Sequence, residues 1–150
     1  MITGIRSAII CEAVDYVQGE YPIFRGVTDD RLWAQTRPGI VQFTLALQVA
    51  TDKRPTKVEI RYEFDSFEEC VDYPIPIGVG VATLVLPMTI PVSETGILTI
   101  AISDPMRNGK PFKYDWHVDF IDGAHDLDAR QTQGLFHAAV EKMRAELAPN

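Results

Sequence analysis

Hydrophobic and polar side chains alternate strictly over residues 111–121. The apolar positions are Phe112, Tyr114, Trp116, Val118 and Phe120, and the polar positions between them are Lys113, Asp115, His117 and Asp119. Successive side chains of a β-strand leave the backbone on opposite sides, so a period of two predicts a half-buried strand. The aromatic side chains on one parity make this segment the largest expected contributor to the core.

Further segments along the chain have the composition or the alternation of β-strands. They are residues 5–17, 23–28, 41–51, 58–64, 71–77, 84–92 and 98–102. Short turns join several neighbouring segments, and a parallel pair would need a crossover of a dozen or more residues. We therefore expect antiparallel hairpins between the first two segments, between 41–51 and 58–64, and between 98–102 and 111–121.

Prolines distinguish two of these segments. Pro74 and Pro76 lie on one parity of the first, and Pro87 and Pro91 lie on one parity of the second. A proline cannot donate a ladder hydrogen bond, so we expect each segment to be an edge strand or an extended segment beside one.

The hydrophobic period changes after Gly123. Phe136, Val140, Met143 and Leu147 recur at the spacing of one helical face, which predicts an amphipathic helix over about residues 128–147. Asp128 is the expected N-cap. The pattern as a whole predicts a single, mainly β domain over residues 1–150: a two-sheet antiparallel β-sandwich of about eight strands with one C-terminal helix. An open barrel is the alternative.

Composition and charge narrow the classes of function. The chain has 150 residues, 46% hydrophobic residues and a net charge of −7. Such a charge repels phosphate backbones and anionic membrane surfaces at long range, so we expect no nucleic-acid partner. No apolar run reaches the length of a membrane span or of a signal sequence, and a cytoplasmic location is expected. Cys11 and Cys70 lack CxxC spacing, which predicts two buried reduced thiols.

Motifs for the common chemistries are absent from the sequence. No serine has the glycine spacing of a hydrolase elbow, and Gly78 and Gly80 lack the third glycine of a nucleotide fingerprint. No HExxH or paired-cysteine zinc pattern occurs, and the acidic segment 65–72 does not fit a calcium loop. We therefore expect a protein without enzymatic activity.

One segment, residues 115–128, concentrates carboxylates with histidines. Its members are Asp115, His117, Asp119, Asp122, His125, Asp126 and Asp128. The first three share one face of the expected strand, and together with Asp122 they are candidate ligands of a divalent cation. His117 with Asp115 or Asp119 would alternatively be an acid/base pair. The ordinary interpretation is a solvated strand face followed by helix-capping aspartates. Among the aromatic residues, Trp33 and Tyr21 lie outside the clear patterns and are candidates for ligand or partner contact.

Three short motifs carry a resemblance to a known family. They are residues 7–12 (SAIICE), residues 24–27 (FRGV) and the Asp104–Pro105 turn. The chain resembles a family of short bacterial β-rich proteins that is known only as a domain of unknown function. The resemblance implies a compact, stand-alone cytoplasmic β-rich domain and carries over no catalytic residue.

The expected function is protein interaction or self-association. The contact surface would be the helix stripe Phe136, Val140, Met143 and Leu147, or an edge strand marked by prolines. The alternative is a sandwich that binds a divalent cation or a small ligand through the cluster near residues 115–128. We expect no cofactor apart from such a cation.

Overall fold

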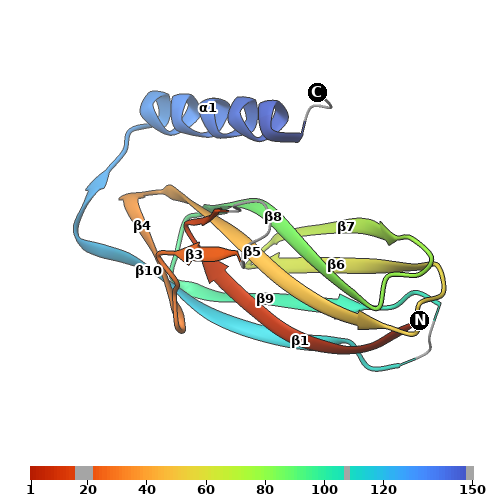
Figure 1. The fold of residues 1–150 in the computed structure, drawn as a ribbon. Coiled ribbons are helices and arrows are strands. Elements are labelled where there is room, and N and C mark those ends of the chain that lie inside the picture. Colours follow the sequence, from red (N-terminus) through yellow and green to blue (C-terminus); the bar gives the residue numbers. More distant parts are fainter. Residues whose placement is uncertain (16–21, 107–108, 148–150) are drawn as a thin grey trace.

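The computed structural model describes residues 1–15, 22–106 and 109–147. The chain is mainly β with one C-terminal helix (Figure 1). Its elements are β1 (Ile2–Cys11), β2 (Ala13–Asp15), β3 (Ile23–Arg25), β4 (Arg31–Arg37), β5 (Gly39–Thr51), β6 (Thr56–Phe64), β7 (Phe67–Ile75), β8 (Val81–Val92), β9 (Gly96–Ser103), β10 (Phe112–Asp126) and α1 (Ala129–Leu147).

The strands form two larger sheets and one small hairpin. The three-stranded sheet has the order β1-β5-β8, and the five-stranded sheet has the order β4-β10-β9-β6-β7. β2 pairs only with β3 among the described strands. Among the described strands, β4 and β10 run parallel and the other pairs run antiparallel. An all-antiparallel, two-sheet sandwich of eight strands is therefore not confirmed. A parallel pair needs a long connection, and the distance between β4 and β10 in the sequence allows one.

Both larger sheets contribute to one hydrophobic core. Leu45, Leu47 and Val49 of β5 are fully buried in the same cluster as Ile100 of β9 and Trp116 of β10. Trp116 is 5% exposed. The alternation over residues 111–121 therefore correctly predicted the strand and the burial of Trp116 and Val118. Tyr114 and Phe120 are half-buried, and Phe112, at the start of the strand, is 43% exposed rather than buried.

One expected hairpin is wrong. Residues 41–51 and 58–64 are strands, but β5 pairs with β1 and β8, whereas β6 pairs with β7 and β9. The short connection therefore carries the chain from one sheet to the other. Alternation shows which face of a strand is buried, and both β5 and β6 bury theirs in the shared core. It does not show which neighbour satisfies the backbone hydrogen bonds.

Other pairings agree with the sequence pattern. β9 and β10 form the expected hairpin, in which Trp116 lies opposite Leu98. β2 and β3 form the expected first hairpin, and residues 16–21 between them lie outside the described residues. Most of the predicted segment 5–17 belongs to β1, however, which pairs with β5. β7 and β8, the strands with prolines, are edge strands. Because a proline lacks an N–H, both occupy positions where a donor can be missing.

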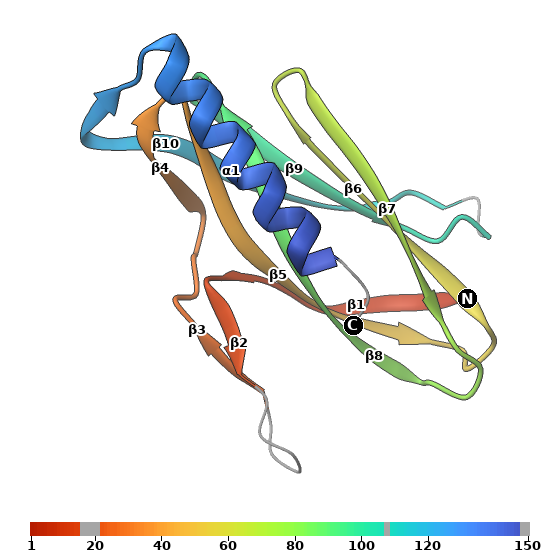
Figure 2. The same cartoon turned by 90° about the horizontal axis from the view of Figure 1, so that it is seen from above.

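The helix covers the outer face of the three-stranded sheet. α1 contacts β5 and β8, and Ala139 on its inner side is 6% exposed (Figure 2). Lys142 Nζ donates to Gln42 Oε1 of β5 at 3.2 Å. Asp128 caps the helix as expected, because its Oδ1 accepts the backbone N–H of Gln131 at 2.8 Å. Among the described residues, no helix has both the length and the apolar character that a membrane span requires.

Candidate functional site

The outer face of the five-stranded sheet carries charged side chains that alternate in sign along β6. Lys57, Glu59, Arg61 and Glu63 alternate with buried residues of β6 and therefore point away from the core. In the register of β6 with β7, Glu59 lies opposite Asp72 and Arg61 lies opposite Cys70. We call this surface of β6 and β7 the charged face. It exists because strand pairing aligns two polar parities that are far apart in the chain.

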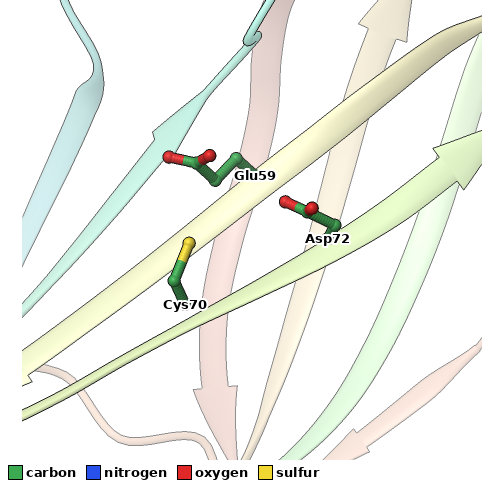
Figure 3. Close-up of side chains that lie close together, drawn as sticks. All are labelled: Glu59, Cys70 and Asp72. Atoms are coloured by element: carbon green, nitrogen blue, oxygen red, sulfur yellow. The ribbon is translucent and has the colours of Figure 1, made fainter.

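Three side chains of the charged face lie close together. The Cys70 Sγ and one carboxylate oxygen each of Glu59 and Asp72 are within 4.8 Å of one another. Figure 3 shows that Glu59 comes from β6 and that Cys70 and Asp72 come from β7. A thiolate and two carboxylates are donors that Zn²⁺ accepts.

Two cations are paired with these carboxylates. Lys57 Nζ forms an ion pair with Asp72, and Arg61 lies 3.8 Å from Glu59 and 3.5 Å from Glu68. The hydrogen bond to Asp72 raises the pKa of Lys57, and the neighbouring Cys70 raises the pKa of Arg61. Both cations therefore stay protonated at neutral pH. A metal ion would have to displace them, so the arrangement is that of an ion-pair network.

A shallow hollow of about 420 Å³ adjoins the charged face. Small residues of β9, Ala101 and Ser103, form its base, and Arg61 and Lys113 flank it. The charged face is therefore hollowed beside Arg61. This shape favours contact with a protruding side chain.

The predicted cation ligands lie on the same sheet but do not gather. Asp115, His117 and Asp119 point outward from β10, and Asp122 is exposed beyond them. Asp115 accepts a hydrogen bond from Thr99 at 2.7 Å, and Asp119 pairs with an arginine of β4 at 3.0 Å. No three of the predicted ligands come within 4.8 Å of one another in the described part of the chain.

Strand geometry explains this spacing. Side chains two positions apart on one strand are separated by about 6.5 Å, so ligands for one ion usually come from neighbouring strands. A cation at Asp115, His117, Asp119 and Asp122 therefore stays a prediction.

The sequence contained a signal for the charged face that was missed. Cys70 was expected to be buried, but it is exposed, whereas Cys11 is buried as expected. Val71 and Tyr73 take the inward parity of β7, so Cys70 shares the outward parity with Asp72. Parity alone could have placed Cys70 outside. Its proximity to Glu59 required the register.

The predicted partner-binding stripe is partly used within the chain. Phe136 is half-buried where α1 docks on its own sheet, and Val140 is 42% exposed. The side chains of Met143 and Leu147 lie outside the described residues. Of the two loop aromatics, Tyr21 lies outside the described residues and Trp33 is 51% exposed on β4.

Comparison with known proteins gives no assignment. No family model matches the chain, and no curated protein matches it.

Proposed function

We propose that this protein is a non-enzymatic self-association module in which two copies meet through the charged face. The observation that carries the proposal is the order of charges on β6. From Lys57 to Glu63 the outward side chains are positive, negative, positive and negative. Such a series changes sign when it is read backwards.

A two-fold axis uses this property directly. Let the axis lie between the charged faces of the two copies, perpendicular to β6 and above Ile60. The two β6 strands then face each other antiparallel, with Glu59 of each copy opposite Arg61 of the other and Lys57 opposite Glu63. A parallel arrangement would place like charges opposite each other. The pattern therefore favours a closed, symmetric dimer of one orientation.

The same two-fold axis is also compatible with the charges on the neighbouring strand, β7. Ile60 pairs with Val71, so the axis also passes above Val71 of β7. Cys70 of one copy then faces Asp72 of the other, and Glu68 faces Pro74. No like-charged pair arises at these described positions of β7. Since α1 covers the outer face of the other sheet, the charged face is the open sheet surface.

The experiment exchanges charges at the axis. Glu59→Arg places two arginines, and Arg61→Glu two glutamates, opposite each other across the axis, so each single variant should be monomeric. The double exchange Glu59→Arg with Arg61→Glu restores opposite charges and should dimerise again. An equimolar mixture of the two single variants should form a heterodimer. Sedimentation velocity at low salt measures all four masses.

The controls separate association from folding and from net charge. Arg6→Glu changes the net charge as much as Arg61→Glu does, but it lies on β1, so its dimer should persist. At about 1 M salt, where the Debye length is about 3 Å, the wild-type dimer should weaken. Unfolding midpoints confirm that each variant is folded. A wild-type monomer at millimolar protein, or failure of the double exchange to restore the dimer, would contradict the proposal.

Divalent-cation binding is the alternative function. Its support is the approach of Cys70, Glu59 and Asp72 within 4.8 Å. Calorimetry with calcium, magnesium, manganese and zinc tests it, with Cys70→Ala as the variant that should remove zinc binding and Asp115→Ala as the control for the face of β10. If none of the four ions produced heat, the result would contradict the divalent-cation alternative.

Three finer expectations belong to the same proposal. The two larger sheets would act as one sandwich-like unit, because both bury side chains in the shared core. The supporting argument for a cytoplasmic location is the free thiol of exposed Cys70, which suits a reducing compartment. The resemblance to short bacterial β-rich proteins stays a proposal on its three motifs.

A further inference from the structure

A second hollow lies beside β4, which forms the opposite edge of the five-stranded sheet from β7. β4, β5 and the first half of α1 come together there (Figure 2). The hollow has a volume of about 450 Å³, within the range of about 300–1,000 Å³ that small-molecule pockets occupy. Its described lining residues are Glu12, Trp33, Gln35, Thr36, Ile40, Val41, Gln42 and Leu135. We call it the corner groove.

The corner groove combines an aromatic surface with fixed polar groups. Trp33 is 51% exposed, and the Arg31 guanidinium carbon lies 6.0 Å from its ring centroid. Gln42 is held by Lys142 at 3.2 Å, and the Thr36 hydroxyl donates to the Pro38 carbonyl at 2.9 Å. These contacts fix the polar atoms without filling the groove. Preorganised groups of this kind lower the entropic cost of binding.

Glu12 is placed by two segments that are distant in the sequence. Its backbone N–H donates to the Arg25 carbonyl at 2.9 Å, and its side chain packs against Gly26, where an added Cβ would lie 2.7 Å from the Glu12 Cγ. Gly26 has a φ of 64°, a conformation that favours glycine. The segments 7–12 and 24–27 thus meet beside the groove and position its carboxylate.

From these features we infer that the corner groove binds a neutral, polyhydroxylated ligand of the size of a saccharide. The amides of Gln35 and Gln42 both donate and accept, and Glu12 accepts, which complements hydroxyl groups that both donate and accept. The indole of Trp33 offers a flat apolar surface for the C–H face of a sugar ring. Among the described lining residues Glu12 alone carries charge, and its carboxylate disfavours an anionic ligand. The two cations beside the groove already have partners: Lys142 donates to Gln42, and Arg31 pairs with Asp119.

The test uses the two tryptophans of the chain as reporters. Trp33 is exposed in the groove and Trp116 is 5% exposed in the core, so each indole N–H gives its own NMR signal, assigned with Trp33→Phe. Titration with D-glucose, N-acetyl-D-glucosamine and maltose should move the Trp33 signal saturably with at least one probe and leave the Trp116 signal in place. Glu12→Gln and Gln35→Ala should each weaken that binding about tenfold, the loss of about one hydrogen bond.

The control and the contrary outcomes are specific. Gln48 lies on β5 outside the described groove lining, so Gln48→Ala should leave binding unchanged. The inference is overturned if none of the three probes moves the Trp33 signal, or if the response survives undiminished in Glu12→Gln and Gln35→Ala. A response to arginine, a cationic probe, without a response to any saccharide would also overturn it.

Discussion

Asp104 Oδ2 accepts the backbone N–H of Ile2 at 2.8 Å, although the two residues are 102 positions apart. The other carboxylate oxygen accepts the N–H of Met106 at 2.9 Å, and Asp104 is 9% exposed. One buried carboxylate therefore joins the start of β1 to the segment after β9. This contact ties the edge of the three-stranded sheet to the five-stranded sheet.

Removing this carboxylate should destabilise the fold. Asp104→Ala removes the carboxylate that accepts two backbone hydrogen bonds, and we expect the free energy of unfolding to fall by about 1–3 kcal/mol. Asp104→Asn keeps one carbonyl acceptor and should cost less. Urea titration measures both, with the exposed Asp122→Ala as the control. If Asp104→Ala unfolded at the same urea concentration as the wild type, the contact would contribute nothing.

The N-terminus of α1 offers a second prediction, on local stability. Asp128 Oδ1 accepts the Gln131 N–H at 2.8 Å, and Gln131 Oε1 accepts the Asp128 N–H at 3.1 Å, which is a capping box. Asp128→Ala should cost the helix about 1 kcal/mol. Gly134→Ala should stabilise it by about 1 kcal/mol, because an added Cβ meets nothing within 4 Å there.

Hydrogen exchange of the α1 amides distinguishes these changes from global effects. Asp128→Ala should speed exchange in α1 while leaving β10 protected, and Gly134→Ala should slow it. Equal changes in the helix and in the core strands would show instead that α1 unfolds only with the whole domain.

Local signals in the sequence were sufficient for several elements. The alternation around Trp116 placed its ring in the core, and Asp128 before an apolar period identified the helix start. Such features depend on neighbours in the chain. The exposure of Cys70 is likewise local information, because Cys70 shares the outward parity of β7 with Asp72.

The pairing of strands that are far apart in the sequence could not be predicted from these local signals. The assignment of β5 and β6 to different sheets depends on partners such as β1 and β8, which lie far away in the chain. The parallel pair of β4 with β10 and the approach of Glu59 to Cys70 depend on register in the same way. Alternation constrains one strand at a time, so the elements could be predicted but not the charged face.

The start of β5 gives a third prediction, on close packing. An added Cβ at Gly39 would lie 2.5 Å from the backbone oxygen of Thr36. A backbone atom cannot move away as a flexible side chain can, so Gly39→Ala should lower the free energy of unfolding by about 1–3 kcal/mol. Gly4→Ala is the matched control, because an added Cβ there meets nothing within 4 Å. Equal unfolding midpoints for the two variants would contradict the steric argument.

The last prediction concerns alkaline pH and the Tyr62 phenol. Tyr62 is 4% exposed and donates its hydroxyl hydrogen bond to Glu69. Burial, with this hydrogen bond second, raises the pKa of Tyr62 well above its usual value. Burial likewise raises the pKa of Tyr73 and of the Cys11 thiol. In each case the folded state holds the proton more tightly than the unfolded state does.

The sign of the effect follows from this difference. The stabilisation is fully present below the unfolded pKa, which is about 10 for a tyrosine and about 8.5 for a cysteine, and it is lost as the pH rises toward the folded pKa. Urea titrations from about pH 8 to about pH 11 should therefore show decreasing stability, with a shallower decrease in Tyr62→Phe. Glu69→Gln should keep most of the slope, since burial is the larger cause. Both variants retain Cys11, so its contribution cancels in the comparison with the wild type. An unchanged slope in Tyr62→Phe would show that the phenol ionises equally in both states.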